Sequence, residues 1–83
     1  MYKVSFEKRA YKEFMKLDGE AQQVVAEKIK SLQRGDFHGD KALKGKHNGK
    51  FRKHAGNYRI VYYKENRLLV ITIIRIAHRK EVY

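Results

Sequence analysis

The 83-residue sequence predicts an α+β domain in which an antiparallel four-stranded sheet carries an N-terminal two-helix hairpin on one face, in the order β-α-α-β-β-β. Two observations carry this prediction. Apolar residues recur at helical intervals in the first half of the chain, whereas the second half holds three runs rich in β-branched and aromatic residues. A short alternating stretch at the N-terminus supplies the fourth strand. A chain of this length is expected to form a single domain, residues 1–83.

The first half predicts one strand followed by two helices. Residues 2–6 alternate between apolar and polar side chains, as a half-buried strand does. Residues 7–17 place apolar side chains at helical spacing, and residues 21–32 do so again. Asp18 is a suitable N-cap for the second helix, and Gly35 is a suitable residue to end it. Because the connection is short, the two helices are expected to form an antiparallel hairpin.

The second half predicts a loop and then a three-stranded meander. Residues 35–49 contain four glycines among charged residues and show no apolar period, which is typical of a loop. The three strand-like runs that follow are residues 50–54, 57–63 and 67–77. Only two or three residues separate them, so each should pair with the next in an antiparallel hairpin. With the helices on one face of this sheet, the other face is left for basic side chains.

The net charge of +11, from 20 basic and 9 acidic residues, predicts a polyanionic partner. The basic residues are concentrated in residues 41–64, a segment that contains no acidic residue. The eight basic residues of this segment are Lys41, Lys44, Lys46, Lys50, Arg52, Lys53, Arg59 and Lys64. The acidic residues lie mostly in the first half of the chain, so the basic surface belongs to the second half.

Other features of the composition exclude several classes of protein. There is no cysteine, so disulfides and thiolate metal sites are excluded. No stretch approaches the roughly 20 apolar residues of a membrane span, and the first ten residues lack the apolar core of a signal peptide. We therefore expect a cytoplasmic protein that does not bind membranes.

Several basic residues are spaced so that they gather on one patch of the predicted sheet. Arg52 and His54 are two positions apart in one strand, so their side chains project from the same face. Arg59 lies on the next strand, and His78 and Arg79 come at the end of the last strand. If these strands are neighbours, the five side chains lie close together.

Such a cluster suits cleavage of RNA by its own 2′-hydroxyl group. The reaction needs a base for the hydroxyl proton, an acid for the leaving oxygen, and positive charge to stabilise the transition state. Arginine contacts two phosphate oxygens at once, and a histidine, with a usual pKa of about 6.5, can act as base or acid. Tyr83 is a further candidate base, because the neighbouring cations Arg79 and Lys80 would lower the pKa of a tyrosine. No metal site is visible in the sequence, and no cofactor is expected.

The same residues also fit purely structural roles. Arg52, His54 and Arg59 would serve as solvated charges on an exposed sheet face. His78 would end a strand with a satisfied hydrogen bond, and Tyr83 would pack the chain end against the domain. Composition and periodicity by themselves therefore predict a basic α+β domain that binds nucleic acid or an acidic protein.

Four motifs occur in an order that resembles the RelE/ParE superfamily of bacterial toxins. They are "ALKG", "FRKH", "GNYRIVY" and "HRKEVY". Together with the preceding strand and helical hairpin, the resemblance covers essentially the whole chain. It implies a microbial RNase fold, with a curved antiparallel sheet and two helices on its back. For the RelE branch it also implies metal-independent, ribosome-dependent cleavage of mRNA in the A site.

The resemblance also assigns residues, motif by motif. Arg52 and His54 match two alternating basic positions of one strand, although lysine or arginine is more usual at position 54. Arg59 matches an arginine that contacts the scissile phosphate, Arg79 one that stabilises the transition state or leaving group, and Tyr83 a tyrosine that orients or deprotonates the 2′-hydroxyl. A further set is expected to bind RNA or the ribosome, namely Lys41, Lys44, Lys46, Lys50, Lys53, His78 and Lys80.

The resemblance implies partners as well. We expect an acidic antitoxin that covers the basic surface, and, for the RelE branch, the ribosome and mRNA. The toxin alone is expected to be a monomer and to form a larger complex with its antitoxin. Two alternatives remain open: a ParE-like toxin that inhibits DNA gyrase without cutting RNA, and a simple RNA-binding module. The co-facial Arg52 and His54 favour cleavage, because a gyrase inhibitor needs no cluster centred on a phosphate.

Overall fold

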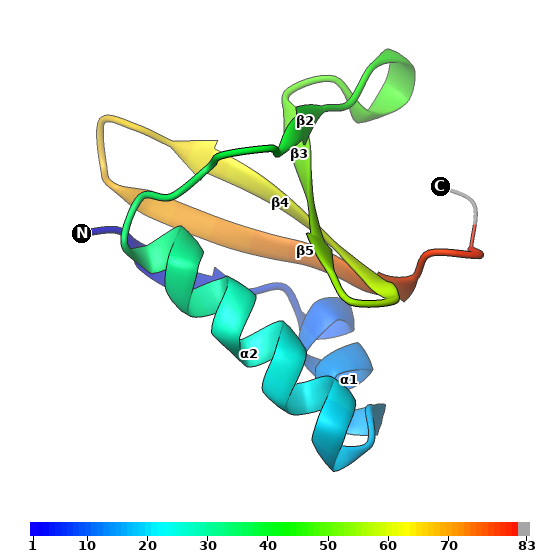
Figure 1. Ribbon diagram of the computed structural model, residues 1–83. Helices are drawn as coiled ribbons and strands as arrows, with labels where there is room; N and C mark the ends of the chain where they lie inside the picture. Colours follow the sequence, from blue (N-terminus) through cyan, green and yellow to red (C-terminus); the bar gives the residue numbers. More distant parts are fainter. Residues whose placement is uncertain (82–83) are drawn as a thin grey trace.

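The computed structural model describes residues 1–81, in which two helices cover one face of a five-stranded sheet (Figure 1). The strand order is β1-β5-β4-β3-β2. Along the chain the elements are β1 (Lys3–Phe6), α1 (Lys8–Lys16), α2 (Gly19–Gln33), β2 (Lys41–Ala42), the 3-10 turn η1 (Gly45–His47), β3 (Lys50–Ala55), β4 (Tyr58–Glu65) and β5 (Val70–His78). The predicted α+β fold with an N-terminal helical hairpin is confirmed.

The ends of α2 form where the sequence places its capping residues. The Asp18 carboxylate accepts a hydrogen bond of 2.8 Å from the backbone N–H of Ala21, which satisfies one free donor of the first turn. At the other end Gly35 has a φ of +80° and donates its N–H to the Leu32 carbonyl. Within residues 1–81, neither helix is long and apolar enough to cross a membrane.

The hydrophobic core lies between the helices and one face of the sheet. Both helices contribute to it, as do the alternate residues of β3, β4 and β5. The largest fully buried side chains are Tyr62, Leu32, Ile60, Ile71, Ile73 and Val25. The opposite face of the sheet lies away from the helices, except at its edge, where Arg75 pairs with Glu13 of α1. We call this surface the open face.

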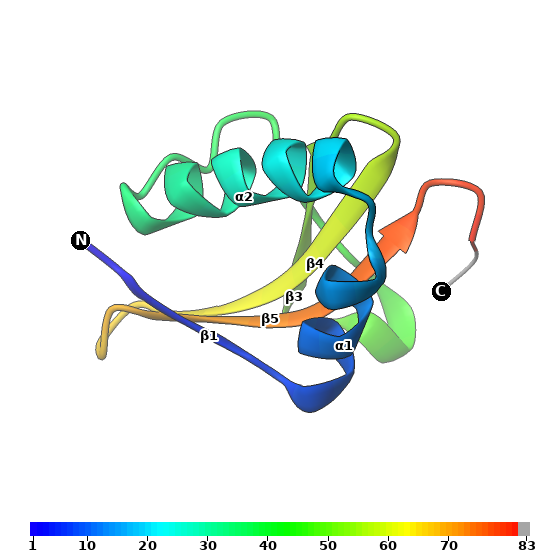
Figure 2. The ribbon, with the colours of Figure 1, turned by 90° about the horizontal axis from the view of Figure 1, so that it is seen from below.

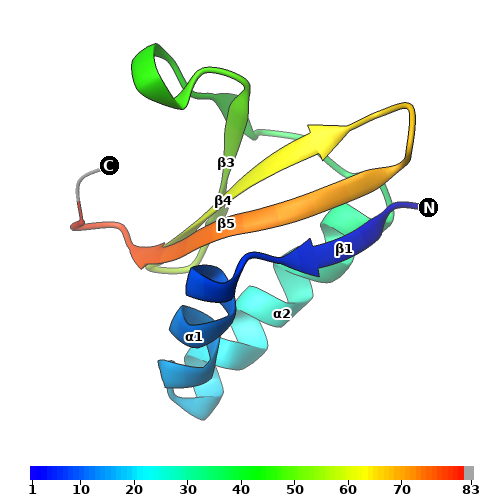
Figure 3. The same ribbon diagram turned by 180° about the vertical axis from the view of Figure 1, so that it is seen from behind.

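β1 runs parallel to β5 (Figure 3), so the expectation of a wholly antiparallel sheet is wrong for this strand. Residues 2–6 alternate in the same way in either kind of pairing, and the sequence pattern therefore does not define a direction. The helical hairpin defines it. It returns the chain to the start of β1, where the Tyr2 N–H donates to the Gln33 carbonyl at 2.9 Å. β3 then begins at this same end of the sheet, and the meander makes β5 parallel to both β3 and β1.

The predicted loop contains one further strand, β2, which was not expected. It is only two residues long and pairs antiparallel with β3 at the edge of the sheet. The loop before it is held by a buried ion pair. Lys53 Nζ lies 3.0 Å from the Asp40 carboxylate, with side chains only 7% and 4% exposed, and the Tyr62 hydroxyl donates a hydrogen bond to the same carboxylate.

A β-bulge in β5 changes which side chains face the helices. The pairing with β4 shifts by one residue between Ile73 and Arg75. As a result Ile73 and Ile76, three positions apart, both reach the core. After the bulge Arg75 lies on the open face and His78 on the helix side.

Candidate functional site

The basic side chains of the open face lie in two neighbouring rows across the strands. In the first row, Arg52 is paired with Val61 of β4 and with Lys41 of β2. In the second row, His54 is paired with Arg59. Side chains directly opposite in such pairs have Cβ atoms about 5 Å apart, and diagonal ones about 7–8 Å. Arg52, His54 and Arg59 are therefore brought together, as the sequence predicted.

Strand alternation explains why these three side chains share a face. Phe51 and Ala55, which flank them in β3, pack into the core on the helix side. Arg52 and His54 must then point the other way. In β4 the same rule applies to Arg59, because its neighbours Tyr58 and Ile60 face the core.

The guanidinium groups of Arg52 and Arg59 are partly buried and incompletely satisfied. The Nε atom of each is buried, and neither has a hydrogen-bond partner among residues 1–81. Val61 and Ala77, also on the open face, are each only 2% exposed, which indicates that the long side chains beside them cover them. A buried N–H group without a partner is costly, and such groups are rare in native proteins.

Arg79 lies just beyond the row of His54 and Arg59, at the same end of the sheet. Its backbone N–H donates to the Asn57 carbonyl in the β3–β4 turn at 2.8 Å, and its side chain is exposed. Arg59 is paired with Ala77, two residues before Arg79. The structure therefore places the backbone of Arg79 close to the row of Arg59.

The other predicted RNA-binding lysines border this surface with one exception. Lys41 and Lys50 lie on strands of the open face, while Lys44 and Lys46 are exposed around η1. Figure 1 shows this turn, and residues 79–81 after β5, projecting from the sheet on the side away from the helices. Lys80 is exposed in that C-terminal segment.

Lys53 is the exception, and its predicted role in RNA binding needs correction. It faces the helix side of the sheet and is only 6% exposed, because its ammonium group pairs with Asp40. In the sequence it looks like one more cation of a basic run. Its alternation with Arg52 and His54 was the signal that it lies on the opposite face.

His78 is also displaced from the open face, so its predicted place in the basic cluster is wrong. It is paired with Tyr58 in β4, and the two rings meet edge to face with centroids 5.3 Å apart. The β5 bulge is the cause, because it shifts the alternation of every residue after it.

Tyr83, the remaining predicted catalytic residue, lies outside the described residues.

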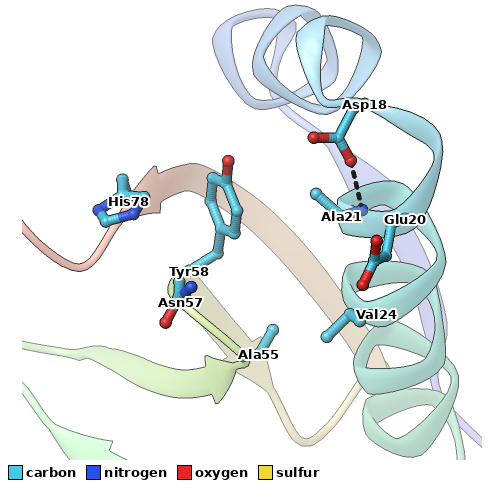
Figure 4. Close-up of a pocket in the computed structure, with 9 residues that line it drawn as sticks. Asp18, Glu20, Ala21, Val24, Ala55, Asn57, Tyr58 and His78 are labelled. Atoms are coloured by element: carbon cyan, nitrogen blue, oxygen red, sulfur yellow. Dashed lines mark hydrogen bonds between the residues drawn. The ribbon is translucent and has the colours of Figure 1, made fainter.

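His78 instead lines a pocket of about 340 Å³ between the first turn of α2 and the β3–β4 turn (Figure 4). Figure 2 shows that turn curling towards α2. The pocket is also lined by Asp18, Glu20, Val24 and Tyr58. Two carboxylates at its rim make it unfavourable for a phosphate, so the pocket and the basic cluster are separate surfaces.

Sequence reasoning missed Arg75, which is the fourth arginine of the open face. It is paired with Val61 in the row of Arg52. Its Nη2 lies 2.9 Å from Glu13 in α1 and 3.3 Å from Glu81. The hydrogen bond to Glu13 is the main reason that the pKa of Arg75 is raised above its usual value. The run of isoleucines around it hid its face, since a bulge cannot be read from a strand without polar alternation.

No three His, Asp or Glu side chains of residues 1–81 come close enough together to hold a metal ion. The open face presents guanidinium groups that can bind oxyanions, next to the exposed side chain of His54.

Comparison with known proteins identifies the family. The family described as "ParE toxin of type II toxin-antitoxin system, parDE" matches residues 4–83. A search of curated proteins found no match.

Solved structures of toxins share the fold over nearly the whole chain. A chain of the RelBE2 toxin–antitoxin complex of Mycobacterium tuberculosis is 28% identical, with a TM-score of 0.84, 94% of this chain covered and 98% of the other. A chain of the archaeal RelE–RelB complex of Pyrococcus horikoshii is 22% identical (TM-score 0.78), with 98% of both chains covered. The isolated Escherichia coli RelE toxin is 21% identical (TM-score 0.78), with 99% of this chain and 88% of the other covered. This chain belongs to the ParE toxin family of type II toxin–antitoxin systems, within the RelE/ParE superfamily.

Proposed function

We propose that this toxin is a metal-independent endoribonuclease of the cytoplasm that cleaves mRNA in the ribosomal A site and so inhibits translation. One observation carries the proposal: the buried, unpartnered Nε atoms of Arg52 and Arg59 on the open face. These two side chains are held in neighbouring rows without an acceptor for Nε, and guanidinium groups bind phosphate through paired hydrogen bonds.

The proposed reaction is attack of the 2′-oxygen on the adjacent phosphorus. The bond from phosphorus to the 5′-oxygen breaks, leaving a 2′,3′-cyclic phosphate and a 5′-hydroxyl end. A base takes the 2′-hydroxyl proton, and an acid returns a proton to the leaving oxygen. Arg52 and Arg59 stabilise the negative charge that develops on the phosphate.

His54 and Arg79 supply the remaining roles in this proposal. His54 is exposed directly opposite Arg59, where it can reach a 2′-hydroxyl next to a phosphate held by that arginine. Arg79 approaches from the end of β5 and stabilises the leaving group. Tyr83, which follows Arg79 by four positions, is the second candidate for the base.

An acidic antitoxin and the ribosome are the proposed partners. The RelBE2 and P. horikoshii structures are complexes of a toxin with its antitoxin, which supports the same arrangement here. A net charge of +11 favours fast association with an acidic protein. Basic side chains around the open face are proposed to contact ribosomal RNA, where phosphate contacts position the toxin without reading sequence. They are Lys41, Lys44, Lys46, Lys50 and Lys80.

The test is cleavage of mRNA on programmed ribosomes, mapped by primer extension, beside the same mRNA without ribosomes. We expect a cut within the A-site codon that requires the ribosome and is lost in Arg59→Ala. Arg67→Ala is the matched control, because Arg67 is an exposed arginine in the β4–β5 turn, away from the cluster. If folded wild-type protein makes no cut on ribosomes, the proposal is wrong.

The match to a family of ParE toxins supports the ParE-like alternative as a second candidate, namely inhibition of DNA gyrase without nuclease activity. A supercoiling assay with purified gyrase distinguishes the two functions. Inhibition by stoichiometric toxin, without any cut in ribosome-bound mRNA, would establish the second function and exclude the first.

A further inference from the structure

Glu81 is an acidic side chain at the border of a basic surface, and its contacts suggest why it is there. Its Oε1 accepts a hydrogen bond of 3.3 Å from the backbone N–H of His78. Its own N–H donates to the His78 carbonyl at 2.9 Å. These two bonds close a turn over residues 78–81, and Arg79 and Lys80 occupy the middle of that turn.

The turn is tied to the body of the domain through Arg75. Glu81 Oε2 lies 3.3 Å from Arg75 Nη2. Arg75 is itself anchored on α1, since its Nη2 and Nε lie 2.9 and 3.0 Å from Glu13 Oε2. Glu13 also accepts the backbone N–H of Ile76 at 2.9 Å. A continuous chain of contacts therefore joins the first helix to the turn that carries Arg79.

Besides the link through Arg75, a second bond holds the turn of residues 78–81, and it comes from the β3–β4 turn. The Arg79 N–H donates to the Asn57 carbonyl in the β3–β4 turn at 2.8 Å. The backbone of Arg79 is therefore held between the β3–β4 turn and the chain of contacts through Glu13, Arg75 and Glu81. The bond from the Lys80 N–H to His78 Nδ1, at 3.2 Å, and the main-chain bond from the Glu81 N–H do not depend on the Glu81 side chain. That side chain adds the links to the His78 N–H and to Arg75.

The charge of Glu81 argues against a role in binding RNA directly. Glu13 is paired with Arg9 as well as with Arg75, so the two carboxylates and two guanidinium groups balance, and Glu81 offsets positive charge beside the cluster of Arg52 and Arg59. A carboxylate there repels phosphate and lowers RNA affinity. Exposed ion pairs contribute little to the free energy of unfolding, and the Glu81 side chain is 55% exposed.

We propose that Glu81 is a positioning residue for Arg79: through Arg75 it holds the turn of residues 78–81 so that the Arg79 guanidinium reaches the phosphate bound at the open face. This inference rests on the proposed RNA cleavage. Removing the charge of Glu81 should raise the affinity for RNA but lower the rate of cleavage. Removing a residue that binds RNA should lower both.

The test compares Glu81→Gln and Glu81→Asp with the wild type on programmed ribosomes. Glu81→Gln removes the charge at nearly constant shape, and it should bind RNA as tightly or more tightly. Its kcat should fall about tenfold, since a misplacement of about 1 Å in a catalytic group can cost up to ~100-fold. Glu81→Asp keeps the charge but shortens the side chain, and it should lose kcat without gaining affinity.

Glu27→Gln is the matched control, because Glu27 also sits in an exposed ion pair, with Lys30 on α2. It should cleave at the wild-type rate. Backbone relaxation measured by NMR gives a readout independent of activity: the amides of Arg79 and Lys80 should become more mobile on the ps–ns timescale in both Glu81 variants.

The outcomes separate this inference from the proposed function. If the wild type cuts and both Glu81 variants cut at the same rate, the positioning role is wrong. If the wild type does not cut, the proposed function is wrong, and the relaxation data alone test whether Glu81 holds the turn of residues 78–81. Unchanged mobility of Arg79 and Lys80 would overturn it.

Discussion

Arg79 combines a fixed backbone with an exposed side chain. Its N–H is bound by Asn57, whereas no acidic residue of the described chain forms an ion pair with its guanidinium group. Replacement of Arg79 should therefore lower the rate of RNA cleavage much more than the stability of the fold. This is the behaviour expected of a residue that stabilises a transition state.

We expect Arg79→Ala to lower the rate of cleavage on ribosomes at least tenfold, which is about 1.4 kcal/mol of barrier. The melting temperature should stay close to that of the wild type, because the lost side chain is exposed. Arg67→Ala, with the same loss of charge at the other end of the sheet, should cleave normally. Cleavage by Arg79→Ala at the wild-type rate would remove Arg79 from the site.

Tyr62 is the residue whose chemistry is most altered by the fold. It is fully buried, and its hydroxyl donates a hydrogen bond to Asp40. Burial, and secondly this hydrogen bond to a carboxylate, raise the pKa of Tyr62 far above its usual value of 10.0. In the unfolded chain the same phenol ionises near its usual pKa.

The sign of the linkage follows from that difference. The contribution of Tyr62 to stability is fully present below about pH 10 and is lost as the pH rises further, because only the unfolded state releases the proton. In an alkaline titration followed by tyrosine absorbance, one of the six tyrosines should ionise only as the protein unfolds. Tyr62→Phe should lower the amplitude of that last phase. An unchanged amplitude would show that Tyr62 ionises in the folded protein.

At the level of elements, the segment between α2 and β3 is held by the Asp40–Lys53 pair and by Phe37, whose ring packs against Tyr62. It contains only the two residues of β2 and the short turn η1 as regular structure. A buried ion pair need not stabilise a protein relative to apolar residues, but loss of one partner leaves the other charge buried and unpaired. The pair therefore specifies where this segment lies against the sheet.

Asp40→Ala should lower the free energy of unfolding by about 3 kcal/mol or more, as measured by urea denaturation. The reason is that Lys53 and the Tyr62 hydroxyl both lose their acceptor inside the protein. Glu27→Ala, which breaks an exposed pair, should cost less than about 1 kcal/mol. If the two variants prove equally stable, the Asp40–Lys53 pair does not anchor the segment.

At the level of the whole molecule, the two faces of the sheet differ in the side chains that they present. The helix side holds the core and an acidic pocket, while the open face collects arginines around a small buried patch of Val61 and Ala77. Acidic residues near the open face are engaged by Arg75. The net charge of +11 is thus presented largely on one side of the sheet and around its edge.

RNA binding should accordingly weaken with salt. For single-stranded RNA the logarithm of the binding constant should fall linearly with the logarithm of salt concentration, by about 0.7 for each phosphate contact. Arg52→Ala should reduce that slope by about one contact. Arg67→Ala lowers the net charge equally but should leave the slope unchanged. Equal slopes in all three proteins would place the RNA elsewhere on the surface.

The sequence by itself determined the helical hairpin, the three-stranded meander and the approach of Arg52, His54 and Arg59. These depend on local rules: helical and strand periodicity, the Asp18 cap, and tight turns that make neighbouring runs pair. The co-facial placement of Arg52 and His54 follows from two positions of separation in a strand. The resemblance of the motifs to RelE/ParE toxins added the family, which the comparisons confirm.

Only the tertiary structure decided the features that depend on distant partners. The direction of β1 follows from where the helices return the chain. Lys53 is buried because Asp40, thirteen positions earlier, meets it on the helix side. A bulge whose signal is hidden in a run of isoleucines turns His78 away from the open face and Arg75 towards it. In each case the local pattern permits two arrangements, and packing against another element selects one.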